Sequence, residues 1–308
     1  MTSTATIPPS VSLGRMLHPR FTVTGAPGAQ QLVPANLRAA VLTKEPAGQA
    51  FVTGVASLLR GFATEGTPST LASLELPTTD QGWRDALIDA SIEDTTKRAG
   101  RPLLPAEAAD VTRQAEAIAL EAEGVTSKSG DVVLAPHVVQ SLLTTFATGT
   151  ASPAAANAAR VFTHELEHTI SPDPTLASVT NLRWLEEGGS ELLAHTRLAT
   201  SLRELGLPAM KPTGIAYSDS VLAVAHLASL TTPGSSMREL LQGRALTDVP
   251  AELATRIAAR HQLGAAERTL LTQQFDAFDG SKASAEVIAA FVAERAAVAR
   301  GAAAVTPS

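Results

Sequence analysis

The chain has 308 residues, of which 44% are apolar, 18% are charged and only 4% are aromatic. It contains no cysteine, which excludes disulfides, thiolate metal ligands and a cysteine nucleophile, so any metal must be bound by histidines and carboxylates. The net charge is −6, and no cluster of Lys and Arg with interleaved aromatic residues occurs, which argues against nucleic-acid binding.

Neither a secretory signal nor a membrane span is expected. The N-terminal segment lacks a basic region followed by an apolar run, and no stretch approaches the roughly 18 uninterrupted apolar residues that a spanning helix needs. We therefore expect a cytoplasmic protein without membrane association, and export by a non-classical route stays open.

We expect two regions in the first 125 residues of the chain. Residues 1–48 are rich in Pro, Gly, Ser and Thr and predict an irregular arm that can include a strand at Phe21–Val23. Residues 49–125 predict a helical region with helices at about 50–61, 80–99 and 105–123. The first of these helices has an apolar face formed by Phe51, Val55, Leu58, Leu59 and Phe62.

The third region, residues 126–301, begins with the clearest strand of the sequence. Gly130 and Pro136 bound a short segment at 131–135 that contains β-branched residues. The expected fold class is α+β, predominantly α-helical, with this short β-element before the helix 153–169. Further helices are expected at about 136–148, 178–204 and 216–230, with three more up to residue 301 and a flexible tail at 302–308.

The helix that ends near Thr169 contains the pattern His-Glu-x-x-His at residues 164–168. Residues four apart lie on the same face of a helix, so His164 and His168 can bind one metal ion. Glu165 is offset by about 100° from His164, which places a carboxylate beside the ion, where a general base for the attacking water is needed. The same pattern can also arise by chance on an exposed helix, in roughly one such chain in a hundred.

A second match follows downstream, in Trp-Leu-Glu-Glu-Gly at residues 184–188. With it the sequence resembles the gluzincins, the zinc peptidases that include thermolysin and the aminopeptidase N family. In aminopeptidase N-like enzymes the third zinc ligand is a Glu that follows an eighteen-residue spacer, in a Trp-Leu-Asn-Glu-Gly context. Eighteen residues also separate His168 from Glu187, and Glu186 stands in place of the Asn.

The resemblance implies that His164, His168 and Glu187 bind Zn²⁺ and that Glu165 is the catalytic acid/base acting on zinc-bound water. Glu186 is the rival for the third ligand, because its register differs by only one residue. The spacer length and the Gly that follows favour Glu187.

Two further residues receive roles from the resemblance. Glu191 lies one turn beyond Glu187, where a carboxylate in this family accepts a hydrogen bond from the first motif histidine; a solvated surface Glu is the alternative. Tyr217, the one tyrosine of the chain, begins the helix 216–230 and matches the residue that stabilises the oxyanion. A half-buried core tyrosine is the alternative for Tyr217, and a structural role is favoured for His195.

The resemblance implies a gluzincin-like metallopeptidase catalytic domain at residues 126–301, with a peptide or protein as substrate. The strand 131–135 is a candidate sheet edge for binding an extended peptide, and an interior strand is the alternative. No Gly-x-Met-Glu-Asn segment, which grips the substrate amino terminus in the aminopeptidase N family, occurs. Endopeptidase, aminopeptidase and other amidase activities therefore stay open, as does a catalytically silent scaffold that retains the zinc site.

Overall fold

A computed structural model of the chain describes residues 18–26, 28–64, 69–170, 182–231, 240 and 246–304. The chain folds into two compact units. Unit 1 comprises Met1–Thr169 and Leu198–Thr213, and unit 2 comprises Ile170–Arg197 and Gly214–Ser308. Helices predominate and one five-stranded sheet is present, which confirms an α+β fold that is predominantly α-helical. No described helix has the length and apolar character needed to cross a membrane.

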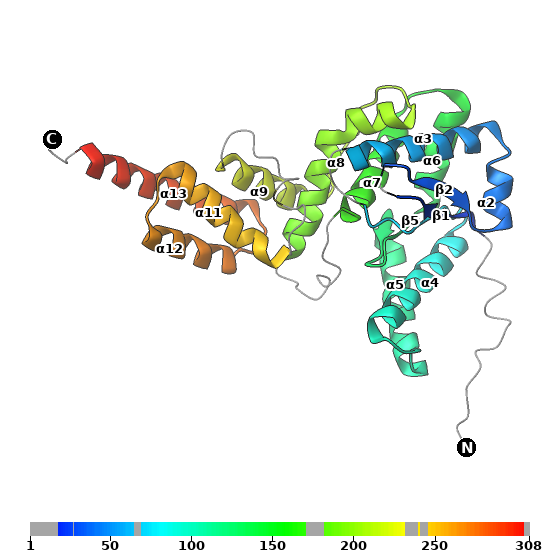
Figure 1. The fold of residues 1–308 in the computed structure, drawn as a ribbon, viewed down its shortest axis with the longest axis horizontal. Coiled ribbons are helices and arrows are strands. Elements are labelled where there is room, and N and C mark those ends of the chain that lie inside the picture. The colour runs from blue at the N-terminus through cyan, green and yellow to red at the C-terminus, as the bar shows by residue number, and fades with distance from the viewer. Residues whose placement is uncertain are drawn as a thin grey trace, which may run out of the picture. The chain divides into compact units, whose positions relative to one another are not determined.

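The sheet lies in unit 1 and has the strand order β2-β1-β3-β5-β4; β1, β2 and β5 are marked in Figure 1. Strands β3 and β5 are parallel, and all other neighbouring strands are antiparallel. The five strands are β1 (Arg20–Thr24), β2 (Gln31–Pro34), β3 (Ser73–Glu75), β4 (Gly124–Thr126) and β5 (Asp131–Leu134).

One expectation about this region is confirmed and one is corrected. The strand expected as a possibility at Phe21–Val23 is present as β1, but the segment is not otherwise irregular, because β2 and the helix α2 (Leu37–Leu42) follow. Strand β1 also pairs with β3, which lies far along the chain, and such long-range pairing leaves no local pattern in the sequence. The strand expected at 131–135 is present as β5. It lies between β3 and β4, so of the two alternatives left open by the sequence the interior strand is the one observed. Strand β4 forms the sheet edge on this side, within the described residues.

The sheet presents an apolar face to the helix α7 (Pro153–His168). Phe21, Leu74 and Val132 lie side by side in the register of β1, β3 and β5, and all three are fully buried. The same register places Thr126 of β4 beside Val132, and α7 packs against both β4 and β5. Successive side chains of a strand point to opposite faces of the sheet, and this alternation determines which side chains reach α7.

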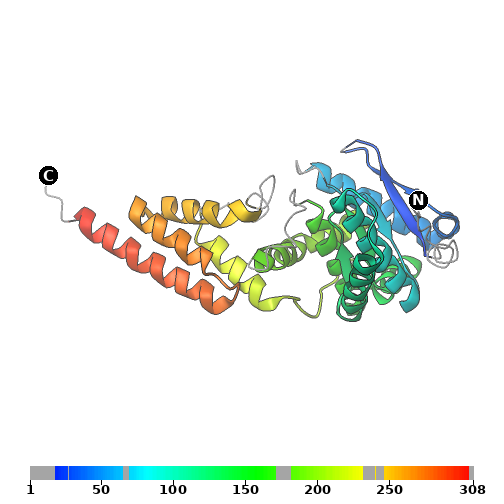
Figure 2. The same ribbon diagram turned by 90° about the horizontal axis from the view of Figure 1, so that it is seen from below.

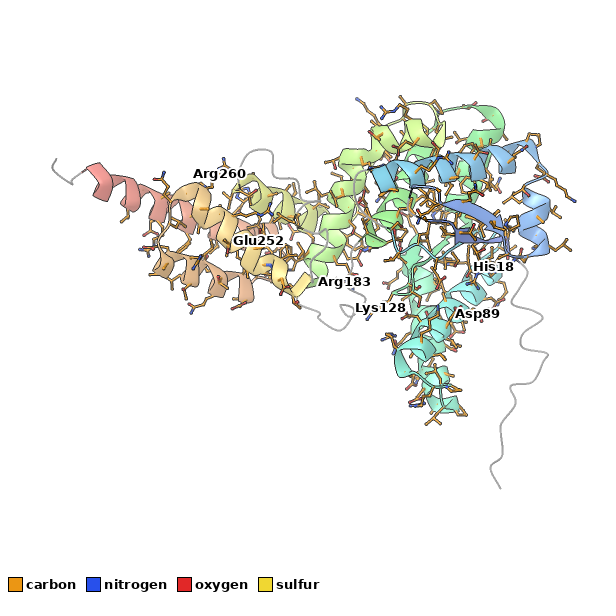
Figure 3. All side chains as sticks on the ribbon, in the orientation of Figure 1. His18, Asp89, Lys128, Arg183, Glu252 and Arg260 are labelled. Atoms are coloured by element: carbon orange, nitrogen blue, oxygen red, sulfur yellow. The ribbon has the colours of Figure 1, made fainter. Side chains whose placement is uncertain are left out.

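The opposite face carries several buried polar residues, and the helix α4 (Asp80–Ala99) packs against β5. The buried carboxylates of Glu75 and Asp131 lie 3.4 and 3.7 Å from the guanidinium of Arg20. The buried imidazole of His18, marked in Figure 3, forms a hydrogen bond to Glu75. These pairings compensate the desolvation of the carboxylates.

The predicted helices of unit 1 are confirmed. The expected apolar face of the first helix is buried in α3 (Pro46–Thr64), which packs against α6 (Pro136–Thr148). The helix α6 in turn packs against α7. Helix α4 pairs with α5 (Pro105–Glu121), and both are marked in Figure 1. The segment Ser171-Pro172-Asp173-Pro174, which should end the helix of the motif because Pro is excluded from a helix interior, lies outside the described residues.

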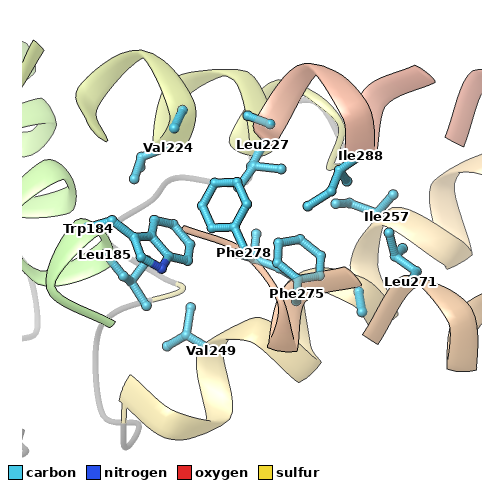
Figure 4. Packing of buried hydrophobic residues seen from close by; sticks show 14 of the residues in the cluster. Trp184, Leu185, Val224, Leu227, Val249, Ile257, Leu271, Phe275, Phe278 and Ile288 are labelled. Atoms are coloured by element: carbon cyan, nitrogen blue, oxygen red, sulfur yellow. The ribbon is translucent and has the colours of Figure 1, made fainter. Parts of the chain in front are cut away.

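Unit 2 is a helical bundle around one apolar core, which Figure 4 shows in close-up. The helix expected at 178–204 is observed as α8, and residues 178–181 lie outside the described part of the chain. The three helices expected after residue 231 are also present and lie side by side in Figure 2. The bundle contains the part of α8 (Arg183–Leu205) up to Arg197, together with α9 (Ser218–Ser229), α11 (Val249–His261), α12 (Ala265–Asp276) and α13 (Lys282–Ala304).

The hydrogen bonds at the start of α5 predict how the stability of the fold changes with pH. The carboxylate of Glu107 accepts hydrogen bonds from the guanidinium of Arg101, at 2.7 and 2.9 Å, and from the backbone N–H of Leu104, at 2.8 Å. These bonds, that from Arg101 first, lower the pKa of Glu107 from 4.5 to about 2. A depressed pKa stabilises the fold above the unfolded value and loses this effect as the pH falls through the folded value.

We therefore expect Glu107→Gln to lower the melting temperature at pH 7. The difference from the wild type should shrink between pH 4.5 and pH 2, as measured by circular dichroism melts across this range. Glu116→Gln, on an exposed position of the same helix, is the control and should not show this pH dependence. An equal deficit at all pH values would contradict the assignment.

Candidate metal centre

The helix α7 carries the His-Glu-x-x-His motif and is buried almost throughout. It begins after Ser152, whose hydroxyl accepts the backbone N–H of Ala155 at 3.1 Å, with Pro153 in the first turn. Every residue from 158 to 167 is buried, including several with polar side chains. A helix interior to the protein with this many polar groups requires partners for them.

The two motif histidines lie together on one face of α7. Their Nε2 atoms are 3.0 Å apart, and the rings meet edge to face at 83°. Two nitrogens bound to one tetrahedral zinc at about 2.0–2.1 Å are separated by about 3.3 Å. The observed distance is therefore close to what a shared ion requires.

Glu187 of α8 completes a group of three possible metal ligands. One ligand atom each from His164, His168 and Glu187 lies within 4.8 Å of the other two. Glu186, the rival for the third ligand, is not part of this group. Two imidazoles and one carboxylate are a donor set typical of catalytic zinc, in which the fourth position is open for water. The donor chemistry thus fits a divalent transition metal, and the identity of the metal is not determined by it.

The core of unit 2 fixes the part of α8 that carries Glu187. The Trp184 ring meets that of Phe278 edge to face at a centroid distance of 4.5 Å (Figure 4). A Cβ at Gly280 would lie 2.2 Å from Trp184 Cβ, and a Cβ at Gly188 would lie 2.8 Å from the backbone of Ser220. Both glycines therefore allow close approach: Gly280 to Trp184, and Gly188, directly after Glu187, to the first turn of α9.

Glu165, expected to be the general base, is buried with 5% exposure. The hydroxyl of Thr126 lies 2.7 Å from its Oε2 and 2.8 Å from its backbone oxygen. A Cβ at Gly124 would lie 2.7 Å from Glu165 Cγ. The sequence did not indicate Thr126 and Gly124, because β4 has only three residues, too few to show the alternation of apolar and polar residues that marks a strand. The turn signal of Ser-Lys-Ser-Gly at residues 127–130, placed before a clear strand, was the one hint of a preceding strand.

Glu191, one turn beyond Glu187, is fully buried, which excludes the solvated surface role. Its Oε1 lies 3.2 Å from Nε2 of His195 and accepts the backbone N–H of Ala216 at 3.0 Å. The expected hydrogen bond between Glu191 and His164 stays a prediction. The observed bonds give Glu191 a second role that the sequence did not indicate, because Ala216 directly precedes Tyr217.

Tyr217 stands at the start of α9, as expected, and is not a core residue, since 44% of it is exposed. Its backbone has φ 49° and ψ 36°, in the left-handed region that residues other than glycine rarely adopt. Such strain occurs frequently at functional sites. The bond from Ala216 to Glu191 holds the chain directly before this strained residue.

Comparisons of the chain with protein-family models, with curated proteins and with solved structures find no match. The resemblance to gluzincins rests on the motif residues themselves.

The geometry predicts which of the two adjacent glutamates binds metal. Glu187→Ala should lower the affinity for Zn²⁺ by more than about 100-fold, because it removes a ligand. Glu186→Ala is the matched control, with the same change one residue away, and should bind Zn²⁺ as the wild type does. Isothermal titration of the metal-free proteins with Zn²⁺ measures both. Equal losses, or the larger loss at Glu186, would contradict the assignment of Glu187.

Proposed function

We propose that this protein is a zinc-dependent peptide-bond hydrolase of the gluzincin type. The observation that carries the proposal is the group formed by His164, His168 and Glu187, since one ligand atom of each lies within 4.8 Å of the others. Two of these residues belong to the His-Glu-x-x-His motif, and the third stands at the spacing known from the aminopeptidase N family. The resident metal we propose is Zn²⁺, which this donor set suits.

A zinc ion held by His164, His168 and Glu187 would supply Lewis-acid chemistry at the site. Glu165, next to His164 in the motif, takes the proton of the attacking water at its carboxylate and passes it to the leaving amine. Tyr217 donates a hydrogen bond to the carbonyl oxygen as negative charge develops there. Its exposed side chain and the anchored backbone before it support this role.

The edge strand β4 supports a peptide as the substrate. An extended peptide can add to a sheet edge through backbone hydrogen bonds, and β4 is paired on one side, with β5, among the described strands. Its Thr126 contacts Glu165 directly. A peptide bound along β4 would therefore pass next to the proposed general base. Endopeptidase and aminopeptidase activities are both compatible with this arrangement.

A second candidate is a scaffold that binds zinc without catalysing hydrolysis. The observation that favours it is the burial of Glu165, whose carboxylate accepts a hydrogen bond within the fold. Both candidates bind the metal, so metal content alone does not separate them. Metal analysis of the wild type and of His164→Ala tests the shared premise, and a folded wild type that binds no metal would contradict both.

Glu165→Gln separates the two candidates. We expect this variant to retain Zn²⁺, because Glu165 is not a ligand, and to lose hydrolysis of a peptide library by about 100-fold to 10,000-fold, because Gln cannot accept the proton. Mass spectrometry of the digested library and of the bound metal measures both quantities. A wild type that cleaves no peptide while binding Zn²⁺ would favour the scaffold.

Tyr217→Phe tests the proposed oxyanion donor. Removing one such donor lowers kcat by about 100-fold to 1,000-fold, and the isosteric ring keeps the side-chain volume. We expect KM and zinc affinity to stay close to those of the wild type. Phe278→Leu, in the core of unit 2, is a control for general destabilisation. Unchanged kcat in Tyr217→Phe would remove Tyr217 from the mechanism.

A further inference from the structure

The hydroxyl of Thr126 contacts the carboxylate and the backbone oxygen of Glu165 at the same time. Its Oγ1 lies 2.7 Å from Oε2 and 2.8 Å from the backbone oxygen. A hydroxyl carries a single proton, so it donates to one acceptor at a time. The contact to Oε2 is the shorter of the two. Thr126 therefore donates to Oε2 of Glu165 and fixes the rotation of the carboxylate plane.

Gly124, two residues earlier on the same face of β4, leaves space for this carboxylate. A Cβ at Gly124 would lie 2.7 Å from Glu165 Cγ and 2.8 Å from Oε1. Gly124 has no positive φ, so a steric requirement and not backbone conformation explains the absence of a side chain. Thr126 and Gly124 thus confine one carboxylate from two neighbouring positions of a strand.

The strand that carries both residues is itself held at its two ends. At its start, Glu123 accepts the backbone N–H of Ala135 at 2.9 Å, and its carboxylate lies 3.4 Å from the buried Arg160 of α7. At its end, the backbone N–H of Ser127 donates to the oxygen of Asp131 at 2.7 Å. A catalytic group is positioned most accurately by residues on such rigid elements.

We infer that Thr126 is a positioning residue for Glu165: its hydrogen bond to Oε2, with the clearance at Gly124, sets where Oε1 of the carboxylate lies. The inference rests on the proposed function of Glu165 as general base. A displacement of about 1 Å in a reacting group can lower a rate by about 100-fold. The effect of losing Thr126 should therefore appear in the chemical step and not in metal binding.

Thr126→Val removes the hydroxyl and preserves the β-branched shape. We expect kcat for peptide hydrolysis to fall by about 10-fold to 100-fold, with KM and Zn²⁺ affinity within about 2-fold of the wild type. Thr126→Ser restores the hydroxyl and should recover kcat to within about 3-fold. Thr22→Val is the matched control, because Thr22 lies on the opposite face of the sheet, beside Ser73. Gly124→Ala should lower kcat in the same way, because its Cβ displaces Glu165.

A double-mutant cycle tests the contact without any catalytic assay. Thr126→Val and Glu165→Ala, alone and combined, are unfolded with urea as metal-free proteins. The hydrogen bond between Thr126 and Glu165 should give a coupling of about 3-fold to 10-fold in the unfolding equilibrium constant.

The two measurements separate the possible failures. Unchanged kcat in Thr126→Val, or a loss that Thr126→Ser does not recover, would overturn the positioning role. A coupling near 1-fold would overturn the contact itself. A wild type that hydrolyses no peptide would instead contradict the proposed function, and with it any role of Thr126 in catalysis, whatever the coupling.

Discussion

The constraint on which the candidate site depends is the burial of helix α7. This helix places Arg160, His164, Glu165 and Glu167 in the interior, each with 6% exposure or less. Removing such groups from water is unfavourable unless each finds a hydrogen bond, an opposite charge or a metal. A helix buried for packing alone would carry apolar residues at these positions. Arg160 pairs with Glu123, Glu165 accepts a hydrogen bond from Thr126, and His164 belongs to the group of three possible metal ligands.

The sheet supplies part of what these buried groups require. Because side chains alternate along a strand, the register between β4 and β5 directs Thr126 to the same face as the buried Val132, towards α7. A shift of one residue would direct Val125 to Glu165 instead. The apolar packing of the sheet against α7 and the polar contact to Glu165 thus arise from one register, and neither can change without the other.

The sequence predicted those parts of the fold and site that leave a local pattern. The periodic face of Phe51 and its neighbours, the strand at β5 and the motif spacing from His164 to Glu187 all follow from residues close in the chain or at a known interval. A strand was possible at Phe21–Val23, where β1 is found, but the pairing of β1 with β3 and the contact of β4 with α7 depend on partners far along the chain. Short strands of this kind have little propensity of their own and are determined by tertiary contacts. For the same reason Thr126 could not be recognised from sequence.

Three glycines outside the His-Glu-x-x-His motif allow close packing around α7 and α8. Gly124 faces Glu165, Gly188 faces Ser220 at the start of α9, and Gly280 faces Trp184; in each case a Cβ would lie less than 3.0 Å from an atom of the facing residue. A metal ligand can be recognised in the sequence by its side-chain functional group. These glycines matter because they have no side chain. Gly124 leaves space for the side chain of Glu165, and Gly188 lets the backbone of Ser220 approach α8 directly after Glu187. A short motif therefore identifies candidate metal ligands, whereas the space around them also depends on small residues outside the motif.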